Sequence, residues 1–201
     1  LITIPKSVKK IGESAFLGCK SLKSVTIPGS VKKIGREAFG TFNGGESAAL
    51  ESVTIADGVE EIGEWAFRDC KSLKSVTIPG SVKTIGKDAF VGCAALESVT
   101  IEDGVGEIGE EAFSDCGELE SVMIKGDIGE IGSRAFYDCK SLKSFTIIGS
   151  VRTIGEGAFD AFCDCPSLKK ITVRGKVDAS VKKQFGLFGE YKKIKLVQGW
   201  H

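Results

Sequence analysis

Seven cysteines carry the most versatile chemistry of this 201-residue chain, because thiols form disulfides, bind metals or attack substrates. All but Cys163 occupy one position of a repeated pattern: Cys19, Cys70, Cys93, Cys116, Cys139 and Cys165. Stacked coils about 4.8 Å apart hold equivalent side chains parallel, which is a poor arrangement for the Cβ approach of about 3.8 Å in a disulfide. We therefore predict a ladder of reduced, buried cysteines. Cys163 and Cys165 are the one local pair that stays open to reaction.

Metal binding and catalysis lack the residues that they need. A single file of cysteines with no histidine beside it does not supply the tetrahedral ligands of a zinc site. The only histidine, His201, is the terminal residue, which excludes a Ser-His-Asp or Cys-His arrangement. We expect no catalytic residue, no metal site and no cofactor, and a protein that is not an enzyme.

Four aspartates precede ladder cysteines and are the remaining candidates for carboxylate chemistry. Other repeats have glycine at the same place, as in Gly18 and Gly92, so the position is typical of a turn. The four are Asp69, Asp115, Asp138 and Asp164.

The cysteines belong to an internal repeat. The phrase Ile-Gly-x-x-Ala-Phe starts at Ile11, Ile34, Ile62, Ile85, Ile108, Ile131 and Ile154. Its spacing is 23 residues except for one of 28, which contains an insertion after Phe39; a second insertion falls near residues 160–162. Recurrence at this period is typical of a solenoid, in which each unit covers the apolar face of its neighbours.

Each repeat contains one clear strand signal. In Val25-Thr26-Ile27 the apolar residues alternate with an outward threonine, as in a half-buried strand. This pattern predicts parallel strands near residues 25–27, 53–55, 76–78, 99–101, 122–124, 145–147, 171–173 and 194–196. Pro-Gly or Asp-Gly supplies the turn that follows.

The rest of the repeat contains only short sequence patterns. Val-x-x-Ile-Gly predicts a short extended stretch, whose glycine suits a left-handed backbone or a close approach between coils. Ala-Phe then begins a compact turn, and we expect little regular α-helix. The phenylalanines should stack as a spine: Phe16, Phe39, Phe67, Phe90, Phe113, Phe136 and Phe159.

The phrase IPGSVKTIGKDAFVGCAALESVT resembles the BspA-type leucine-rich repeats of bacterial and protist surface proteins. The resemblance implies a right-handed, mostly β leucine-rich repeat solenoid of about eight repeats, with turns or short 3-10 segments opposite the parallel strands. We expect one domain over residues 1–201, with regular repeats to 175 and a degenerate capping repeat over 176–201. The resemblance also implies a cell-surface or secreted protein that acts in adhesion or protein–protein recognition through the strand face. The chain itself shows no signal peptide.

Charge is balanced overall, with 27 basic and 27 acidic residues, which argues against a nucleic-acid partner. No apolar run is long enough to predict a transmembrane segment. Residues 102–130 are strongly acidic, whereas 169–195 are mostly basic. This asymmetry is typical of a solvated surface, and it also permits steering of a partner or weak head-to-tail self-association.

Trp65 is the exception at a position where other repeats have polar residues or glycine: Ser14, Glu37, Asp88, Glu111, Arg134 and Gly157. Phe42, in the insertion one repeat upstream, is a candidate to cover it. The pair therefore predicts either local packing or a contact patch for a ligand.

Outward hydroxyl groups form columns along the predicted strands. The threonines are Thr26, Thr54, Thr77, Thr100 and Thr146, and Met123 interrupts them. We expect this face, with Trp65 and Phe42 at its rim, to bind a protein or a glycan at a cell surface. Ice binding is the weaker alternative, because curved sheets of leucine-rich repeats do not match a flat lattice.

Overall fold

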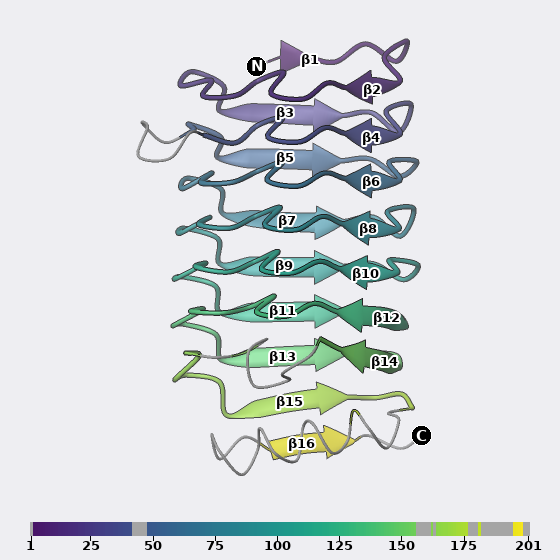
Figure 1. Ribbon diagram of the computed structural model, residues 1–201, viewed down its shortest axis with the longest axis vertical. Coiled ribbons are helices and arrows are strands. Elements are labelled where there is room, and N and C mark those ends of the chain that lie inside the picture. The colour runs from purple at the N-terminus through teal and green to yellow at the C-terminus, as the bar shows by residue number, and fades with distance from the viewer. Residues whose placement is uncertain are drawn as a thin grey trace.

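In a computed structural model the chain forms a solenoid whose coils stack along one axis (Figure 1). The structure describes residues 2–41, 48–155, 162, 164–176 and 181, and the backbone of 195–198. Each coil has three sides: a long strand, a short strand and a stretch of turns that leads to the next coil. We call them the long-strand side, the short-strand side and the turn side.

The long-strand side consists of parallel strands that lie within one residue of the predicted positions, except that the last one, predicted over 194–196, spans Lys195–Gln198. Alternation explains them, since Val25 and Ile27 point into the core while Thr26 is exposed. One sheet contains β1 (Ile2–Thr3), β3 (Ser24–Ile27) and β5 (Ser52–Ile55). A second contains β7 (Ser75–Ile78), β9 (Ser98–Ile101), β11 (Ser121–Ile124), β13 (Ser144–Ile147), β15 (Lys170–Val173) and β16 (Lys195–Gln198).

The short-strand side is a further parallel sheet, where the sequence predicted only short extended stretches. It has seven strands: β2 (Lys10–Ile11), β4 (Lys33–Ile34), β6 (Glu61–Ile62), β8 (Thr84–Ile85), β10 (Glu107–Ile108), β12 (Ile128–Ile131) and β14 (Val151–Ile154). These strands mark seven coils in the described part of the chain, close to the predicted eight repeats. Among the described residues only Val181 is α-helical, in agreement with the prediction of little regular α-helix.

In every described coil but the first, the glycine after the isoleucine of the short-strand side permits a close approach to the preceding coil. A Cβ built on Gly109 would lie 2.7 Å from the carbonyl oxygen of Ile85 and 2.8 Å from the carbonyl carbon of Gly86. The non-glycine residues with positive φ lie elsewhere, on the turn side: Ser14, Glu37, Trp65, Asp88, Glu111 and Arg134, and the aspartates before the ladder cysteines, with Asp69 at φ 54°. Gly18 and Gly92 share the position of these aspartates, with Gly18 at φ 64°, whereas Gly58 and Gly104 have positive φ in the turns after the long strands. The turn assignment of these aspartates is therefore confirmed.

The core is a stack of identical layers. Phe16, Phe39, Phe67, Phe90, Phe113 and Phe136 stack in sequence, with ring centroids 4.9 to 5.4 Å apart and planes within 7°. The next ring on Phe136 is Phe162, at 5.7 Å, whereas Phe159 lies outside the described residues. Phe162 precedes Cys165 by three residues, as in the five other repeats that have a ladder cysteine, so the inserted residues come before Phe162 rather than after Phe159.

The ladder cysteines are free and, apart from the half-buried Cys19, buried. Each buried thiol donates to the carbonyl oxygen of the phenylalanine one coil earlier, at 3.2 Å for Cys93 to Phe67 and 3.1 Å for Cys165 to Phe136. Burial raises the pKa of Cys70 to about 12, with a further contribution from Asp69. Burial likewise raises the pKa of Cys93 and Cys116 and contributes to the raised pKa of Cys139, so these four thiols stay protonated at neutral pH and are poor nucleophiles and poor metal ligands. Cys163 lies outside the described residues.

We expect Cys93→Ser to lower the free energy of unfolding by about 1 to 2 kcal/mol in urea titration. The serine hydroxyl has the same carbonyl acceptor, so the loss comes from the smaller, more polar group in a fully buried site. Cys19→Ser is the matched control in the first coil, where the cysteine is half-buried, and it should cost less than half as much. Equal losses of unfolding free energy for Cys93→Ser and Cys19→Ser would contradict a contribution from burial in the ladder.

The capping repeat predicted over residues 176–201 falls largely outside the described residues, which here include only 176, 181 and the strand β16. β16 pairs in parallel with β15, with Lys195 opposite Lys170. In the part of the chain that the structure describes, no helix has the length and apolar character needed to cross a bilayer.

Candidate functional site

The predicted threonine column exists as a structural feature of the long-strand side. Strand pairing sets Thr26 opposite Thr54 and Thr77 opposite Thr100, and Thr146 opposite Met123 and Thr172. Thr26, Thr54 and Thr77 are exposed, whereas Thr100 and Thr146 are partly covered. Within each of the two sheets the column therefore presents outward side chains on a framework fixed by backbone hydrogen bonds, and it is interrupted between Thr54 and Thr77, where β5 and β7 do not pair.

Two exposed apolar side chains interrupt the polar surface. Met123 on β11 is 41% exposed, and Ile148, just after the end of β13, is 40% exposed. The sequence showed Met123 as a break in the column but did not single out Ile148, which takes the place held by Pro79, Glu102 and Lys125 in earlier coils. An apolar residue at a position that is otherwise polar or proline was the available signal.

Charged residues run along both borders of the long-strand side and pair from coil to coil. Lys23 binds Glu51 at 3.0 Å, Lys74 lies 3.3 Å from Glu97, and Lys143 pairs with Glu120. At the other border Lys125 binds Glu102 at 2.7 Å. These exposed pairs contribute little stability each, about 0 to 1 kcal/mol, but they neutralise part of the acidic stretch over residues 102–130.

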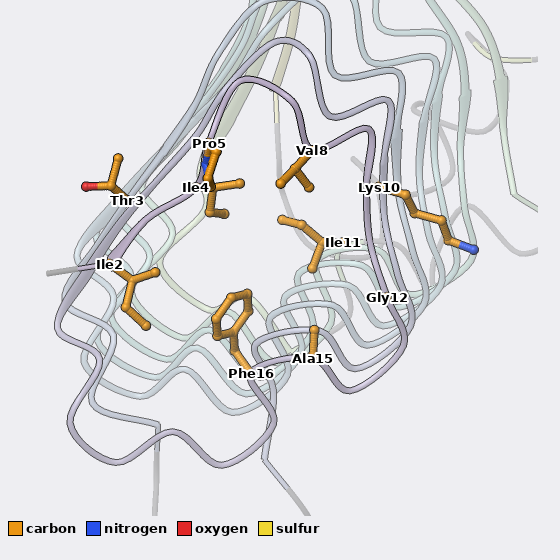
Figure 2. A pocket seen from close by; sticks show the side chains of 10 residues that line it. All are labelled: Ile2, Thr3, Ile4, Pro5, Val8, Lys10, Ile11, Gly12, Ala15 and Phe16. Atoms are coloured by element: carbon orange, nitrogen blue, oxygen red, sulfur yellow. The ribbon is translucent and has the colours of Figure 1, made fainter.

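Trp65 lies on the turn side, between the short strand β6 and the phenylalanine of the spine. In the first coil this stretch, from Gly12 to Phe16, lies on a different side of the triangular section from Thr3, which belongs to the threonine column (Figure 2). Trp65 is therefore not at the rim of the hydroxyl columns but on another side of the solenoid. Phe42 lies outside the described residues.

Trp65 is half-buried and held by its neighbours. The guanidinium of Arg36 lies 4.3 Å from its ring centroid and that of Arg68 lies at 5.4 Å. Its indole N–H donates to the side chain of Asp88, one coil further on. A tryptophan with φ 56° is unusual, and these contacts hold it there. The arrangement favours the local packing interpretation over a free contact patch.

Asp88 is only 7% exposed, and burial raises the pKa of its carboxyl group, although the hydrogen bond from Trp65 opposes the shift. A raised pKa in the folded state means that the folded protein binds the proton more tightly than the unfolded chain. The charged carboxylate therefore lowers stability above the folded-state pKa, and this cost disappears below the unfolded value of about 3.9.

We expect Asp88→Asn to raise the thermal unfolding midpoint at pH 7 and to change it little below about pH 3.9. Asparagine keeps an acceptor for the indole N–H and tolerates the left-handed backbone at φ 55°. Glu111→Gln, at the equivalent half-buried position, is the control and should show no such pH-dependent gain. A gain that is equal at both pH values would show that burial of the charge is not the cause.

The described residues form no group of three or more His, Cys, Asp or Glu side chains that could hold a metal ion. A cavity of about 260 Å³ lies at the first coil, where Ile2, Ile4, Val8, Ile11 and Phe16 form the open end of the core (Figure 2). Its lining is apolar apart from Thr3 and Lys10.

Comparison with known proteins agrees with this architecture. The family model described as the BspA type leucine rich repeat region matches six copies, over residues 1–47 and 40–161. The crystal structure of the T. pallidum leucine rich repeat protein TpLRR is similar at 28% identity and a TM-score of 0.70, over 94% of this chain and 82% of that one. A leucine-rich repeat protein of Eubacterium ventriosum is similar at 26% identity and a TM-score of 0.53, over 73% of this chain and 38% of that one. No curated protein sequence gives a significant match.

The matched repeats cover more than half of the chain, and they carry the phenylalanine spine, the cysteine ladder and the paired short strands described above. Members of such families are in general non-enzymatic repeat proteins that bind other proteins. The chain belongs to the BspA-type leucine-rich repeat family.

Proposed function

We propose that this protein is a recognition module that binds a protein partner through its long-strand side. The observation that carries the proposal is the exposure of Met123 on β11, and of Ile148 just after β13, at the outward face of the six-stranded sheet, where the other outward side chains of β7, β9, β11, β13 and β15 are polar. Exposed apolar side chains set among polar neighbours supply the contact energy of a protein interface, whereas hydroxyl groups and ion pairs supply specificity.

The sheet also lowers the cost of binding. Val122 and Phe145 anchor β11 and β13 in the core, at 2% and 1% exposure, so the outward side chains of these strands start from a fixed backbone. Binding of a partner therefore causes little loss of conformational entropy in this surface. Thr26, Thr54, Thr77, Thr100 and Thr146 extend the contact along the solenoid on both sides of Met123.

Capture from host or cell-surface extracts with immobilised protein tests this function. Met123→Lys and Thr100→Lys should each reduce the captured partner at least about tenfold, because they place a charge in the contact surface. Thr84→Lys is the matched control on the short-strand side and should leave capture unchanged. Capture that survives both long-strand variants and falls with Thr84→Lys would move the binding surface to another side.

A glycan partner is the alternative, and the paired hydroxyl columns favour it. Ser75 and Thr77 on β7 stand opposite Ser98 and Thr100 on β9, which repeats the same two hydroxyl groups from coil to coil. A glycan array probed with the purified protein separates the two functions, since a protein-binding module should give no specific signal. Strong binding to one glycan class that Thr100→Lys abolishes would favour the alternative.

The family resemblance supports adhesion at a cell surface as the setting for this recognition. Weak head-to-tail self-association stays a prediction, and sedimentation analysis across a concentration series tests it. Trp65, on the turn side, and Phe42 stay secondary contact candidates. Trp65→Ala therefore belongs in the capture experiment, together with a measurement of stability.

A further inference from the structure

The long-strand side is divided between β5 and β7. No strand pairing joins them, so three strands form one sheet and six form another. Figure 1 shows the spacing between β5 and β7 as wider than that between the other neighbouring long strands. We call this division the seam. Among the described residues, one backbone hydrogen bond outside the strands crosses the seam. The Lys74 N–H donates to the Glu51 carbonyl oxygen at 3.4 Å.

Pro79 removes one rung of the ladder at this place. In later coils the residue just after the long strand donates its N–H to the strand before it: Glu102 to Ile78 at 2.9 Å, Lys125 to Ile101 at 2.8 Å and Ile148 to Ile124 at 2.7 Å. Pro79 has no N–H to give to the Ile55 carbonyl. Pro28 holds the equivalent position after β3. The pairing of β3 with β1 is also short and ends with Thr3 opposite Thr26.

The other sides of the same coils remain closed. On the short-strand side β6 pairs with both β4 and β8. On the turn side the N–H of Phe67 donates to the carbonyl of Ala89 at 2.8 Å, and the rings of Phe67 and Phe90 stack at 4.9 Å. Beyond the end of the long strands the hydroxyl of Ser81 bridges the two coils, since it accepts from the Gly58 N–H at 2.8 Å and donates to the Val59 carbonyl at 2.7 Å.

The seam is open to solvent. A cavity of about 290 Å³ is lined by Val53, Thr54, Ile55, Ser75 and Thr77. Val53 and Ile55 are 9% and 7% exposed, whereas the equivalent Val99 and Ile101 in the six-stranded sheet are 1% and 0% exposed. The core is thus less well covered here than at the neighbouring strand pairs.

We propose that the seam is a hinge that divides the long-strand side into two plates. The plates, β1–β3–β5 and β7 through β16, are each held by strand pairing, and they change their mutual angle about the continuous short-strand side. Opening costs few backbone hydrogen bonds, because the ladder that resists it elsewhere is missing between β5 and β7. This inference concerns the motion of the solenoid and does not depend on which partner binds.

Distances between spin labels test the hinge. Cysteine-directed labels would be placed in a Cys19→Ser, Cys163→Ser background, because the other five ladder cysteines are buried and protected from the labelling reagent. Labels at Lys23 and Glu120 span the seam, whereas labels at Lys74 and Lys169 span the same four strand intervals, about 19 Å, within the six-stranded sheet. We expect the distance distribution across the seam to be at least about twice as wide as the control distribution.

Hydrogen exchange on the unmodified protein is the second measurement. The Thr77 amide faces the seam, while the amide of Thr100 lies in β9, which is paired with β7. Thr77 should exchange at least about tenfold faster than Thr100. Pro79→Glu, which restores the donor that Glu102 provides in the next coil, should slow exchange at Thr77 and narrow the distance distribution.

Two results would overturn the hinge. Equal widths for the two label pairs would show that the plates move as one body. Protection of Thr77 equal to that of Thr100 would show that the strands are paired across the seam. If Pro79→Glu fails to fold, the label distances and the exchange rates of Thr77 and Thr100, both measured with Pro79 in place, still test the hinge.

Discussion

Phe90→Ala should lower the free energy of unfolding by about 3 to 5 kcal/mol. Phe90 is fully buried, and its ring stacks between Phe67 at 4.9 Å and Phe113 at 5.0 Å. Its removal leaves a cavity that the neighbouring rings cannot fill, because each is held at the coil spacing by backbone hydrogen bonds such as Phe90 N–H to Ala112. Urea unfolding followed by circular dichroism measures the loss.

Phe16→Ala is the matched control for this substitution. Phe16 has one ring neighbour, Phe39 at 5.0 Å, and is only half-buried at the open first coil. Its replacement should cost about half as much as that of Phe90 or less. A similar loss at both positions would mean that stability does not depend on continuity of the spine.

The sequence was sufficient to predict the long strands because their physics is local. The alternation in Ser98-Val99-Thr100-Ile101 decides which side chains face the core, and the repeat decides the stacking. The buried cysteine ladder followed from register alone, since equivalent residues of parallel coils share one environment. Both features are confirmed.

The short-strand sheet was harder to predict because most of its strands have only two residues. A pair such as Thr84-Ile85 has no alternation to recognise, and its pairing comes from the stacking of whole coils. The same applies to the glycine after each isoleucine. The sequence left a left-handed backbone and a close approach as alternatives, and the second applies, since the left-handed residue comes two positions later.

The candidate site was predicted as a column but not as a surface. The register gave Thr77 and Thr100 as outward neighbours, whereas it gave no information on how sides of a coil are arranged in space. Trp65 was therefore expected at the rim of the threonines. It lies instead on the turn side, where its indole N–H donates to the side chain of Asp88. The division at β5 and β7 likewise depends on how two coils meet, although Pro79 was visible in the sequence as the residue that lacks a donor.

Gly109→Ala should lower the free energy of unfolding by about 1 to 3 kcal/mol or more, because of backbone contact and not because of backbone conformation. The N–H of Gly109 donates to the Ile85 carbonyl at 2.8 Å, and a Cβ on Gly109 would lie 2.7 Å from the same oxygen. The two coils would have to separate at this point, which weakens the short-strand hydrogen bonds on both sides. Denaturant unfolding gives the size of the loss.

Gly12→Ala separates this contact from any intrinsic effect of alanine. Gly12 occupies the same place in the first coil, where a Cβ would meet no atom within 4 Å. Alanine there should leave stability unchanged or raise it by up to about 1 kcal/mol, because it reduces the freedom of the unfolded chain. If Gly109→Ala proved as harmless as Gly12→Ala, the close stacking of coils at the Ile-Gly step would not be what selects glycine in the repeat.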